Sequence, residues 1–167
     1  MDIAHLHFLV AEADAAQRRA LVELLGQLGA SRVTDVPDGH LALQRLETGI
    51  GPKVDVAIVD LALPGMDGLE LLRNLGGLQS GPRLIVTGAQ PANLLFSVET
   101  LALAFGVDLL GTIAKPVTAI KLKPLLDNYT PAVRLEDRPA APRFSFQDIG
   151  IGLQKRQFEP FFQPKIE

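Results

Sequence analysis

Five short apolar runs alternate with helix-forming segments along most of the chain. The runs, each of which we predict to be a strand, are residues 6–11, 31–36, 54–60, 83–87 and 107–114. The segments that follow them, each predicted to be a helix, are residues 15–28, 40–48, 68–75, 91–105 and 119–128. Because crossovers between parallel strands are right-handed, this alternation returns every strand to one sheet with helices on both faces. The sequence therefore predicts an α/β fold with a parallel sheet.

The first two predicted helices show which side chains should face the core. Asp14 has the residue type and the position of an N-cap, and Gln17 stands at the capping-box spacing from it. The apolar stripe of the first helix is Leu21, Leu24, Leu25 and Leu28. The stripe of the second helix is Leu41, Leu43 and Leu46. Spacings of three and four residues are typical of the buried side of a helix.

Polar residues stand where four of the predicted strands end. Asp60 ends the third run and is followed by a loop with proline and glycine, residues 61–68. Glu12, Thr87 and Lys115 stand at or just after the ends of the first, fourth and fifth runs. The carboxyl ends of parallel strands share one edge of the sheet, where open α/β folds bind their ligands. We therefore expect the four side chains to lie together.

This combination of side chains favours phosphoryl chemistry. A carboxylate can attack phosphorus and carry the phosphoryl group as an acyl phosphate. Neighbouring acids can hold a divalent cation that neutralises the phosphoryl oxygens, and a lysine and a hydroxyl can bind the oxygens that remain. An aspartyl-phosphate phosphatase also uses a strand-end aspartate, but it needs a second acid two residues later. That position is Ala62, so we set the phosphatase aside.

Composition excludes several other classes of function. The 167 residues carry a formal net charge of −3 and no block of basic residues, so nucleic-acid binding has no electrostatic footprint. No apolar run approaches the roughly 20 residues of a membrane span, and the first residues lack the positive region of a signal peptide. The absence of cysteine excludes disulfides and fits a reducing compartment. We expect a cytoplasmic protein that binds neither nucleic acid nor membrane.

Four motifs carry a resemblance to a known family. They are Phe-Leu-Val-Ala-Glu-Ala-Asp at residues 8–14, Val-Asp at 59–60 with Leu-Pro-Gly-Met-Asp-Gly-Leu-Glu-Leu-Leu at 63–72, Ile-Val-Thr-Gly at 85–88, and Lys-Pro at 115–116. On these motifs, residues 6–128 resemble the receiver domain of bacterial response regulators. The resemblance implies a flavodoxin-like, doubly wound sheet of five parallel strands in the order 2-1-3-4-5, with helices on both faces.

The same resemblance implies a role for each polar residue. Asp60 would accept a phosphoryl group from a partner histidine kinase, Thr87 would be the switch hydroxyl, and Lys115 would contact the phosphate. Mg²⁺ would be held by Glu12, by Asp60 and by the backbone carbonyl of Ala62. The peptide bond after Lys115 is often cis in this family, an isomer that only bonds before proline adopt readily.

Two positions depart from the family pattern. Receivers usually present two adjacent acids after the first strand, and here these positions hold Glu12 and Ala13. Alanine supplies no side-chain oxygen and Asp14 is expected to cap a helix, so we expect weakened Mg²⁺ binding. Thr112 stands where many receivers have an aromatic switch, which makes gating by a ring improbable. Two hypotheses remain: a phosphorylated receiver, and a degenerate pseudo-receiver that acts as an interaction module without phosphorylation.

The chain divides into a receiver domain (1–129), a proline-rich linker (130–146) and a tail (147–167). The tail is predicted to form a helix and then a strand. With Phe-Gln-Pro at 162–164, it resembles the truncated start of an EAL domain, the cyclic di-GMP phosphodiesterase family. The catalytic motifs of that family would lie beyond Glu167. We expect this fragment to be no enzyme by itself, and the full-length protein to be a phosphodiesterase whose EAL domain is controlled by Asp60.

The helix predicted at 91–105 is apolar nearly all round. A helix packed on one side of a sheet normally keeps a polar outer face. The surplus of apolar surface predicts contact with another chain, and receivers often dimerise through their last two helices and the strand between them. We therefore expect a homodimer through the 91–128 face. The alternative is that the helix is deep core covered by the tail.

Overall fold

The structure is a computed structural model that describes residues 2–48, 51–76, 78, 81–89 and 92–130, with the backbone alone at 92–94 and 96. Almost all of the predicted linker and the whole predicted EAL start lie outside the described residues. The domain boundaries at 129 and 146 therefore stay predictions.

Five strands and five helices alternate along the described chain. The strands are β1 (His7–Ala11), β2 (Arg32–Val36), β3 (Val56–Asp60), β4 (Arg83–Gly88) and β5 (Leu109–Ala114). The helices are α1 (Ala15–Gln27), α2 (Gly39–Glu47), α3 (Gly68–Leu75), α4 (Ala92–Phe105) and α5 (Ala119–Asp127). All strand pairs are parallel, in the order β2-β1-β3-β4-β5. The flavodoxin-like fold and its strand order are confirmed.

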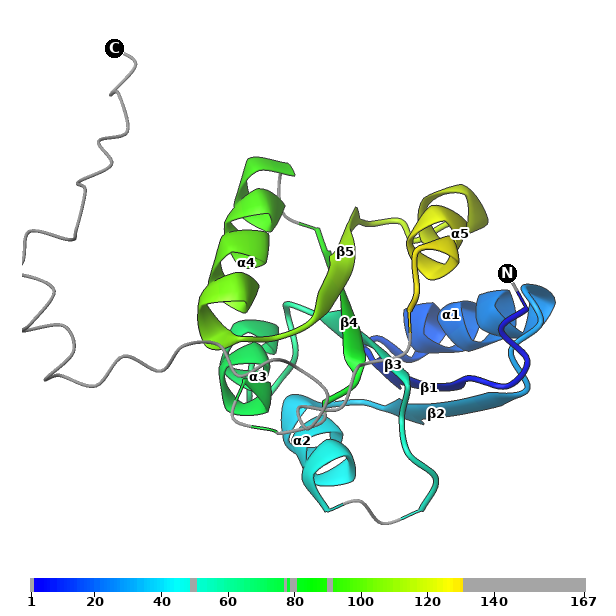
Figure 1. The fold of residues 1–167 in the computed structure, drawn as a ribbon, viewed down its shortest axis with the longest axis horizontal. Coiled ribbons are helices and arrows are strands. Elements are labelled where there is room, and N and C mark those ends of the chain that lie inside the picture. Colours follow the sequence, from blue (N-terminus) through cyan, green and yellow to red (C-terminus); the bar gives the residue numbers. More distant parts are fainter. Residues whose placement is uncertain (1, 49–50, 77, 79–80, 90–91, 131–167) are drawn as a thin grey trace, which may run out of the picture. The chain divides into compact units, whose positions relative to one another are not determined.

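The sheet separates two apolar cores, and Figure 1 shows the helices that lie on its two faces. Phe8 and Val10 of β1 face the core that α1 and α5 cover. Leu9 and Ala11 face the opposite core, which α2, α3 and α4 cover. Successive side chains of a strand point to opposite faces, so a continuous apolar run fills both cores. Burial on both faces of the sheet explains why apolar and polar residues do not alternate along these strands.

Two details of the prediction are corrected. Leu41 was expected in the buried stripe of α2, but its side chain is 43% exposed. The neighbouring Ala42 is fully buried instead, and successive helix residues are rotated by about 100°, which turns Leu41 toward solvent. Some strands are also shorter than the apolar runs that predict them. Leu6 and Val54 are buried but precede their strands, because burial does not require a place in the ladder.

None of the helices in the described part of the chain combines the length and the apolar character that a membrane span needs.

Candidate functional site

Asp60 is the last residue of β3 and only 4% exposed. The loop after it folds back on the strand end, because the backbone N–H of Gly68 donates to the Leu61 carbonyl at 3.0 Å. At Gly68 the backbone passes so close that an added Cβ would lie 2.5 Å from the Asp60 carbonyl oxygen. Asp67 then caps α3 by accepting from the backbone N–H of Glu70. The sequence from strand to helix therefore fixes the Asp60 carboxylate at the carboxyl edge of the sheet.

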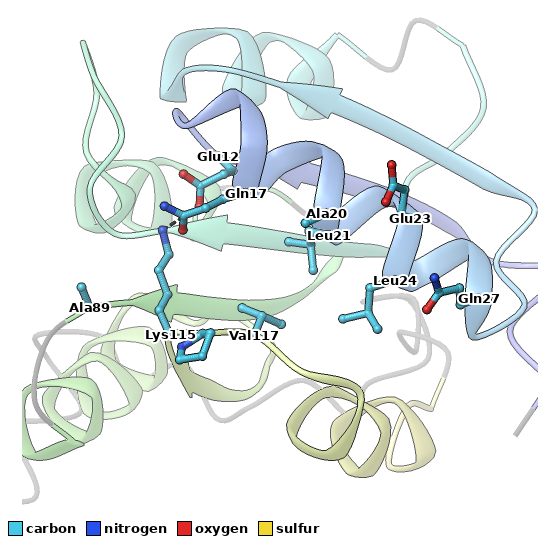
Figure 2. Close-up of a pocket in the computed structure, with 11 residues that line it drawn as sticks. Glu12, Gln17, Ala20, Leu21, Glu23, Leu24, Gln27, Ala89, Lys115 and Val117 are labelled. Atoms are coloured by element: carbon cyan, nitrogen blue, oxygen red, sulfur yellow. Dashed lines mark hydrogen bonds and ion pairs between the residues drawn. The ribbon is translucent and has the colours of Figure 1, made fainter.

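Lys115 joins the two acids predicted for the site. Its Nζ donates to Glu12 Oε2 at 2.6 Å and to Asp60 Oδ2 at 2.8 Å. Figure 2 shows the Lys115 side chain extending from the end of β5 toward Glu12, which follows β1 beside α1. The Lys115-Pro116 peptide bond is cis, as the resemblance implies. Residues far apart in the sequence thus form one network.

Thr87 lies on the strand next to Asp60. It is 1% exposed, and the register of β3 and β4 pairs the two residues directly. The backbone N–H of Leu61 donates to the Thr87 carbonyl at 2.9 Å, which holds the start of the loop against β4. All four predicted groups therefore stand at one edge of the sheet. Ala62, the predicted source of a carbonyl ligand, lies in the same loop with its side chain exposed.

The network keeps Lys115 charged. Burial by itself would lower the pKa of the Lys115 ammonium, because desolvation penalises the charged form. The hydrogen bonds to Asp60 and Glu12 and the negative charges of both acids outweigh this, so the pKa is raised above its usual value. Two buried carboxylates therefore share one permanent counter-charge.

The oxygens around Asp60 can be tested for their fit to a divalent cation. Asp60 Oδ1 is buried without a hydrogen-bond partner, so no protein donor engages its lone pairs. Both oxygens of Glu12 are engaged, one by Lys115 and the other by the backbone N–H of Asp14 at 3.0 Å. Ala13 offers only its carbonyl, which accepts from Arg18 Nη1 at 3.1 Å. No group of three or more acids or histidines among the described residues is arranged as a metal site.

Asp14 does not replace the missing acid. Its Oδ1 accepts from the backbone N–H groups of Ala16 at 2.9 Å and Gln17 at 2.8 Å. These bonds are the first cause of the lowered pKa of the Asp14 carboxyl, with Gln17 contributing most. The predicted N-cap is confirmed. The donor set therefore offers a cation the unpartnered Asp60 Oδ1, and Glu12 can join only if one of its oxygens leaves the Lys115 ammonium or the Asp14 N–H.

Three side chains that bind the site or the strand leading to it were missed by the sequence reasoning. Arg18 of α1 donates to the carbonyls of both Glu12 and Ala13 and pairs with Asp35 of β2 at 2.9 Å. Lys121 of α5 donates to carbonyls in the loop that contains Lys115. The third is Glu99 of α4, which accepts from the Thr112 hydroxyl at 3.0 Å. Arg18 and Lys121 could have been found from the sequence, because each is a basic residue in the first turns of a helix that follows a loop of the site.

Known proteins are similar to this chain in sequence. The family model "Response regulator receiver domain" matches residues 8–127. The chain is 30% identical over 165 residues to the cyclic di-GMP phosphodiesterase RocR of Pseudomonas aeruginosa, an alignment that covers 96% of this chain and 41% of RocR. It is 32% identical over 156 residues to the regulatory protein VirG of Agrobacterium fabrum, covering 90% of this chain and 56% of VirG. The chain thus spans about half the length of the curated relatives it matches.

Solved structures agree with the family model. A response regulator from Colwellia psychrerythraea is 27% identical, with a TM-score of 0.61 over 73% of this chain and 94% of its own. A CheY-like receiver domain from Methanospirillum hungatei has the same fold, with a TM-score of 0.60 at 23% identity over 73% of this chain and 90% of its own. The chain belongs to the response-regulator receiver family.

Proposed function

We propose that this chain is the phosphoryl-accepting module of a two-component response regulator, with Asp60 as the acceptor. The observation that carries the proposal is the asymmetry of the Asp60 carboxylate. Lys115 holds Oδ2 at 2.8 Å, while Oδ1 is buried and has no hydrogen-bond partner. A buried acceptor without a donor is costly unless a ligand satisfies it. A lone pair that no donor engages is also free to attack an electrophilic phosphorus atom.

The transfer is a displacement at phosphorus. Asp60 Oδ1 forms the new P–O bond as the P–N bond of a phosphohistidine breaks, and the electron pair of that bond returns to the imidazole of the donor. Lys115 stands beside the carboxylate to neutralise a phosphoryl oxygen, and the Thr87 hydroxyl on the neighbouring strand binds another. Mg²⁺, when bound by Asp60, the Ala62 carbonyl and Glu12, supplies further neutralisation of the phosphoryl oxygens.

The donor we propose is a histidine kinase in the cytoplasm. A groove of about 700 Å³ runs between α1 and the loop before α5, with Glu12 and Lys115 at one end. Apolar side chains of α1, among them Leu21 and Leu24, line it together with Val117. Figure 2 shows these residues along the same groove. A helix of the kinase seated here would bring its phosphohistidine to the edge of the sheet where Asp60 lies.

The test is intact-mass spectrometry after treatment with acetyl phosphate, with and without saturating Mg²⁺. We expect the mass of one phosphoryl group to be added to the wild type in the presence of Mg²⁺. The Asp60→Asn variant, which keeps the shape of the side chain but loses the nucleophile, should gain nothing. A wild type that stays unmodified at saturating Mg²⁺ would rule the proposal out.

A second candidate is a pseudo-receiver that works as an interaction module without phosphorylation. Ala13 favours it, because the position lacks a side-chain oxygen and Glu12 is already bound to Lys115. Restoring the acid with Ala13→Asp should then raise Mg²⁺ affinity markedly, measured by calorimetric titration. Ala16→Asp is the matched control, since it adds the same charge to an exposed position of α1. Equal Mg²⁺ affinity in the wild type and in Ala13→Asp would count against a metal defect at this position.

For the full-length protein we propose an EAL output domain that hydrolyses cyclic di-GMP. Support comes from the resemblance of residues 147–167 and from the alignment with RocR, which is named a cyclic di-GMP phosphodiesterase. The receiver would control this activity through a homodimer formed by the 91–128 face. Hydrolysis of cyclic di-GMP by the full-length protein, before and after phosphorylation, is the measurement. Equal rates for phosphorylated wild type and Asp60→Asn would contradict control through Asp60.

A further inference from the structure

Lys121 makes hydrogen bonds to the backbone on both sides of Lys115. Its Nζ donates to the carbonyl of Ala114 at 2.7 Å and to the carbonyl of Pro116 at 3.0 Å. These are the residues immediately before and after Lys115. The backbone N–H of Lys115 itself donates to the Gly88 carbonyl at 2.9 Å. The peptide units around Lys115 are therefore fixed by α5 on one side and by β4 on the other.

The place of Lys121 in its helix makes this contact notable. Lys121 is in the first turn of α5, where the positive end of the helix dipole disfavours a cation. The N-cap residue Thr118 makes no side-chain hydrogen bond to the helix. The ammonium of Lys121 instead uses two of its three donors on the carbonyls of Ala114, the last residue of β5, and Pro116 in the loop, which carry partial negative charge. The first turn of α5 therefore lacks a side-chain cap and carries a cation that the helix dipole disfavours. The same cation, the Lys121 ammonium, binds the two carbonyls beside Lys115.

The consequence is transmitted to the phosphoryl site through Lys115. The Lys115 ammonium must reach Glu12 Oε2 and Asp60 Oδ2 together, at 2.6 and 2.8 Å. The ammonium can contact both acids only if the backbone of Lys115 is correctly placed. The peptide units on either side, whose carbonyls Lys121 holds, determine that placement. Lys121 touches neither Asp60 nor Glu12 among the contacts of the described residues, so it would act only through the loop.

We infer that Lys121 is a positioning residue, which holds the loop so that the Lys115 ammonium lies between Glu12 and Asp60. The inference depends on the contacts of Lys115 in the structure. It bears on phosphorylation only through the proposed function of Asp60.

The first test measures Lys115 directly and needs no phosphorylation. Lys121→Met keeps most of the aliphatic stem and removes the donors. The reactivity of the Lys115 amine is then measured by trace reductive methylation of the folded chain, with quantification by mass spectrometry. We expect the reactivity of the Lys115 amine to rise roughly tenfold. This change corresponds to loss of one of the charge-assisted hydrogen bonds that Lys115 makes to Glu12 and Asp60. Lys123→Met is the control, because Lys123 is exposed on the same helix, and it should leave the reactivity unchanged.

Two further variants separate positioning from a general effect on stability. Lys121→Arg should restore slow methylation of Lys115, since the guanidinium fork can donate to both carbonyls. If Lys121→Met folds poorly, Lys121→Gln provides the same test with a shorter neutral side chain that cannot reach both carbonyls. Unchanged Lys115 reactivity in the folded variants would overturn the inference, whatever their melting temperatures.

Phosphorylation by acetyl phosphate is the second readout. If the proposed function is correct, Lys121→Met should slow the phosphorylation of Asp60 by about the same factor by which it raises the reactivity of the Lys115 amine. Lys121→Arg should restore the phosphorylation rate. A wild type that is never phosphorylated, combined with a reactive Lys115 in Lys121→Met, would leave the positioning role standing and reject the proposed function. Normal phosphorylation together with unchanged Lys115 reactivity would reject the positioning role alone.

Discussion

At the scale of single residues, the length of Glu12 decides how the acid site is built. Its extra methylene compared with aspartate lets one carboxylate accept from the Asp14 backbone and from the Lys115 ammonium at once. Lys115 then bonds to two acids. An acid at the position of Ala13 would have added a third negative charge. The network therefore places two carboxylates against one ammonium, and Asp60 Oδ1 keeps no hydrogen-bond partner.

Tyr129 gives a prediction at the same scale. It is 7% exposed and packs in the core beneath α5. Burial, aided by the negative charge of Asp55, raises the pKa of its phenol above 10.0. The stability that this shift contributes is fully present below the unfolded pKa and is lost as the pH rises through the folded pKa. As the pH rises above about 10, the wild type should therefore lose more stability than Tyr129→Phe, which cannot ionise.

The measurement for Tyr129 is urea unfolding followed by circular dichroism at each pH. Lysines titrate in the same range in both proteins, so only the difference between the two curves reports on Tyr129. Parallel loss of stability in wild type and variant would show that the phenol ionises equally in the folded and unfolded chain.

At the scale of elements, close backbone contacts fix where the helices sit on the sheet. At Gly68 an added Cβ would lie 2.5 Å from the Asp60 carbonyl oxygen and 2.8 Å from Leu61 Cα. These are backbone atoms, which cannot rotate away as the end of a side chain could. Gly68→Ala should therefore push α3 away from the end of β3 and destabilise the fold by about 1–3 kcal/mol, the usual cost of overpacking. The free energy of unfolding from urea titration checks it.

Gly26→Ala is the matched control for Gly68→Ala. Gly26 is exposed in α1, and a Cβ there would contact nothing within 4 Å. Since alanine is the better helix former, this variant should gain about 0.5–1 kcal/mol. Equal effects of the two substitutions would mean that the contact of Gly68 with β3 does not limit the packing of α3.

The link between α4 and β5 is a second element-scale prediction. The Thr112 hydroxyl donates to Glu99 Oε1 at 3.0 Å, and both residues are half-buried. Thr112→Val should cost roughly 0.5–1.5 kcal/mol, because a half-buried carboxylate loses a hydrogen-bond donor. A double-mutant cycle with Glu99→Ala, which removes the acceptor, measures the coupling, which should exceed about 0.5 kcal/mol for residues in contact. Additive effects of the two substitutions would show that the bond does not hold α4.

The same contact shows where prediction from sequence stops. The existence of all ten elements, the Asp14 cap and the meeting of Glu12, Asp60 and Lys115 follow from local pattern and from parallel topology. The bond from Thr112 to Glu99 does not, because it depends on how α4 rotates against the sheet. The predicted burial of Leu41 was wrong for a similar reason, since the apolar spacing on so short a helix fits two rotations that differ by one residue.

At the scale of the whole molecule, α4, β5 and α5 form one side of the receiver (Figure 1). β5 is an edge strand, and most of its residues are only half-buried. The largest exposed apolar side chains of the described residues lie on the two adjacent helices: Leu103 on α4 is 81% exposed and Ile120 on α5 is 86% exposed. Exposed apolar surface beside an open sheet edge favours contact with another chain.

Leu103→Lys is the test of the proposed homodimer. If two copies associate through the 91–128 face, a lysine here would place a charge in the apolar contact. The dissociation constant from sedimentation equilibrium should then rise by about tenfold or more, as for a central interface residue. Leu41→Lys is the control, because Leu41 is 43% exposed on α2, away from the 91–128 segment. It should leave the association unchanged. Equal weakening by both variants, or a wild type that remains monomeric at every concentration, would contradict dimerisation through this face.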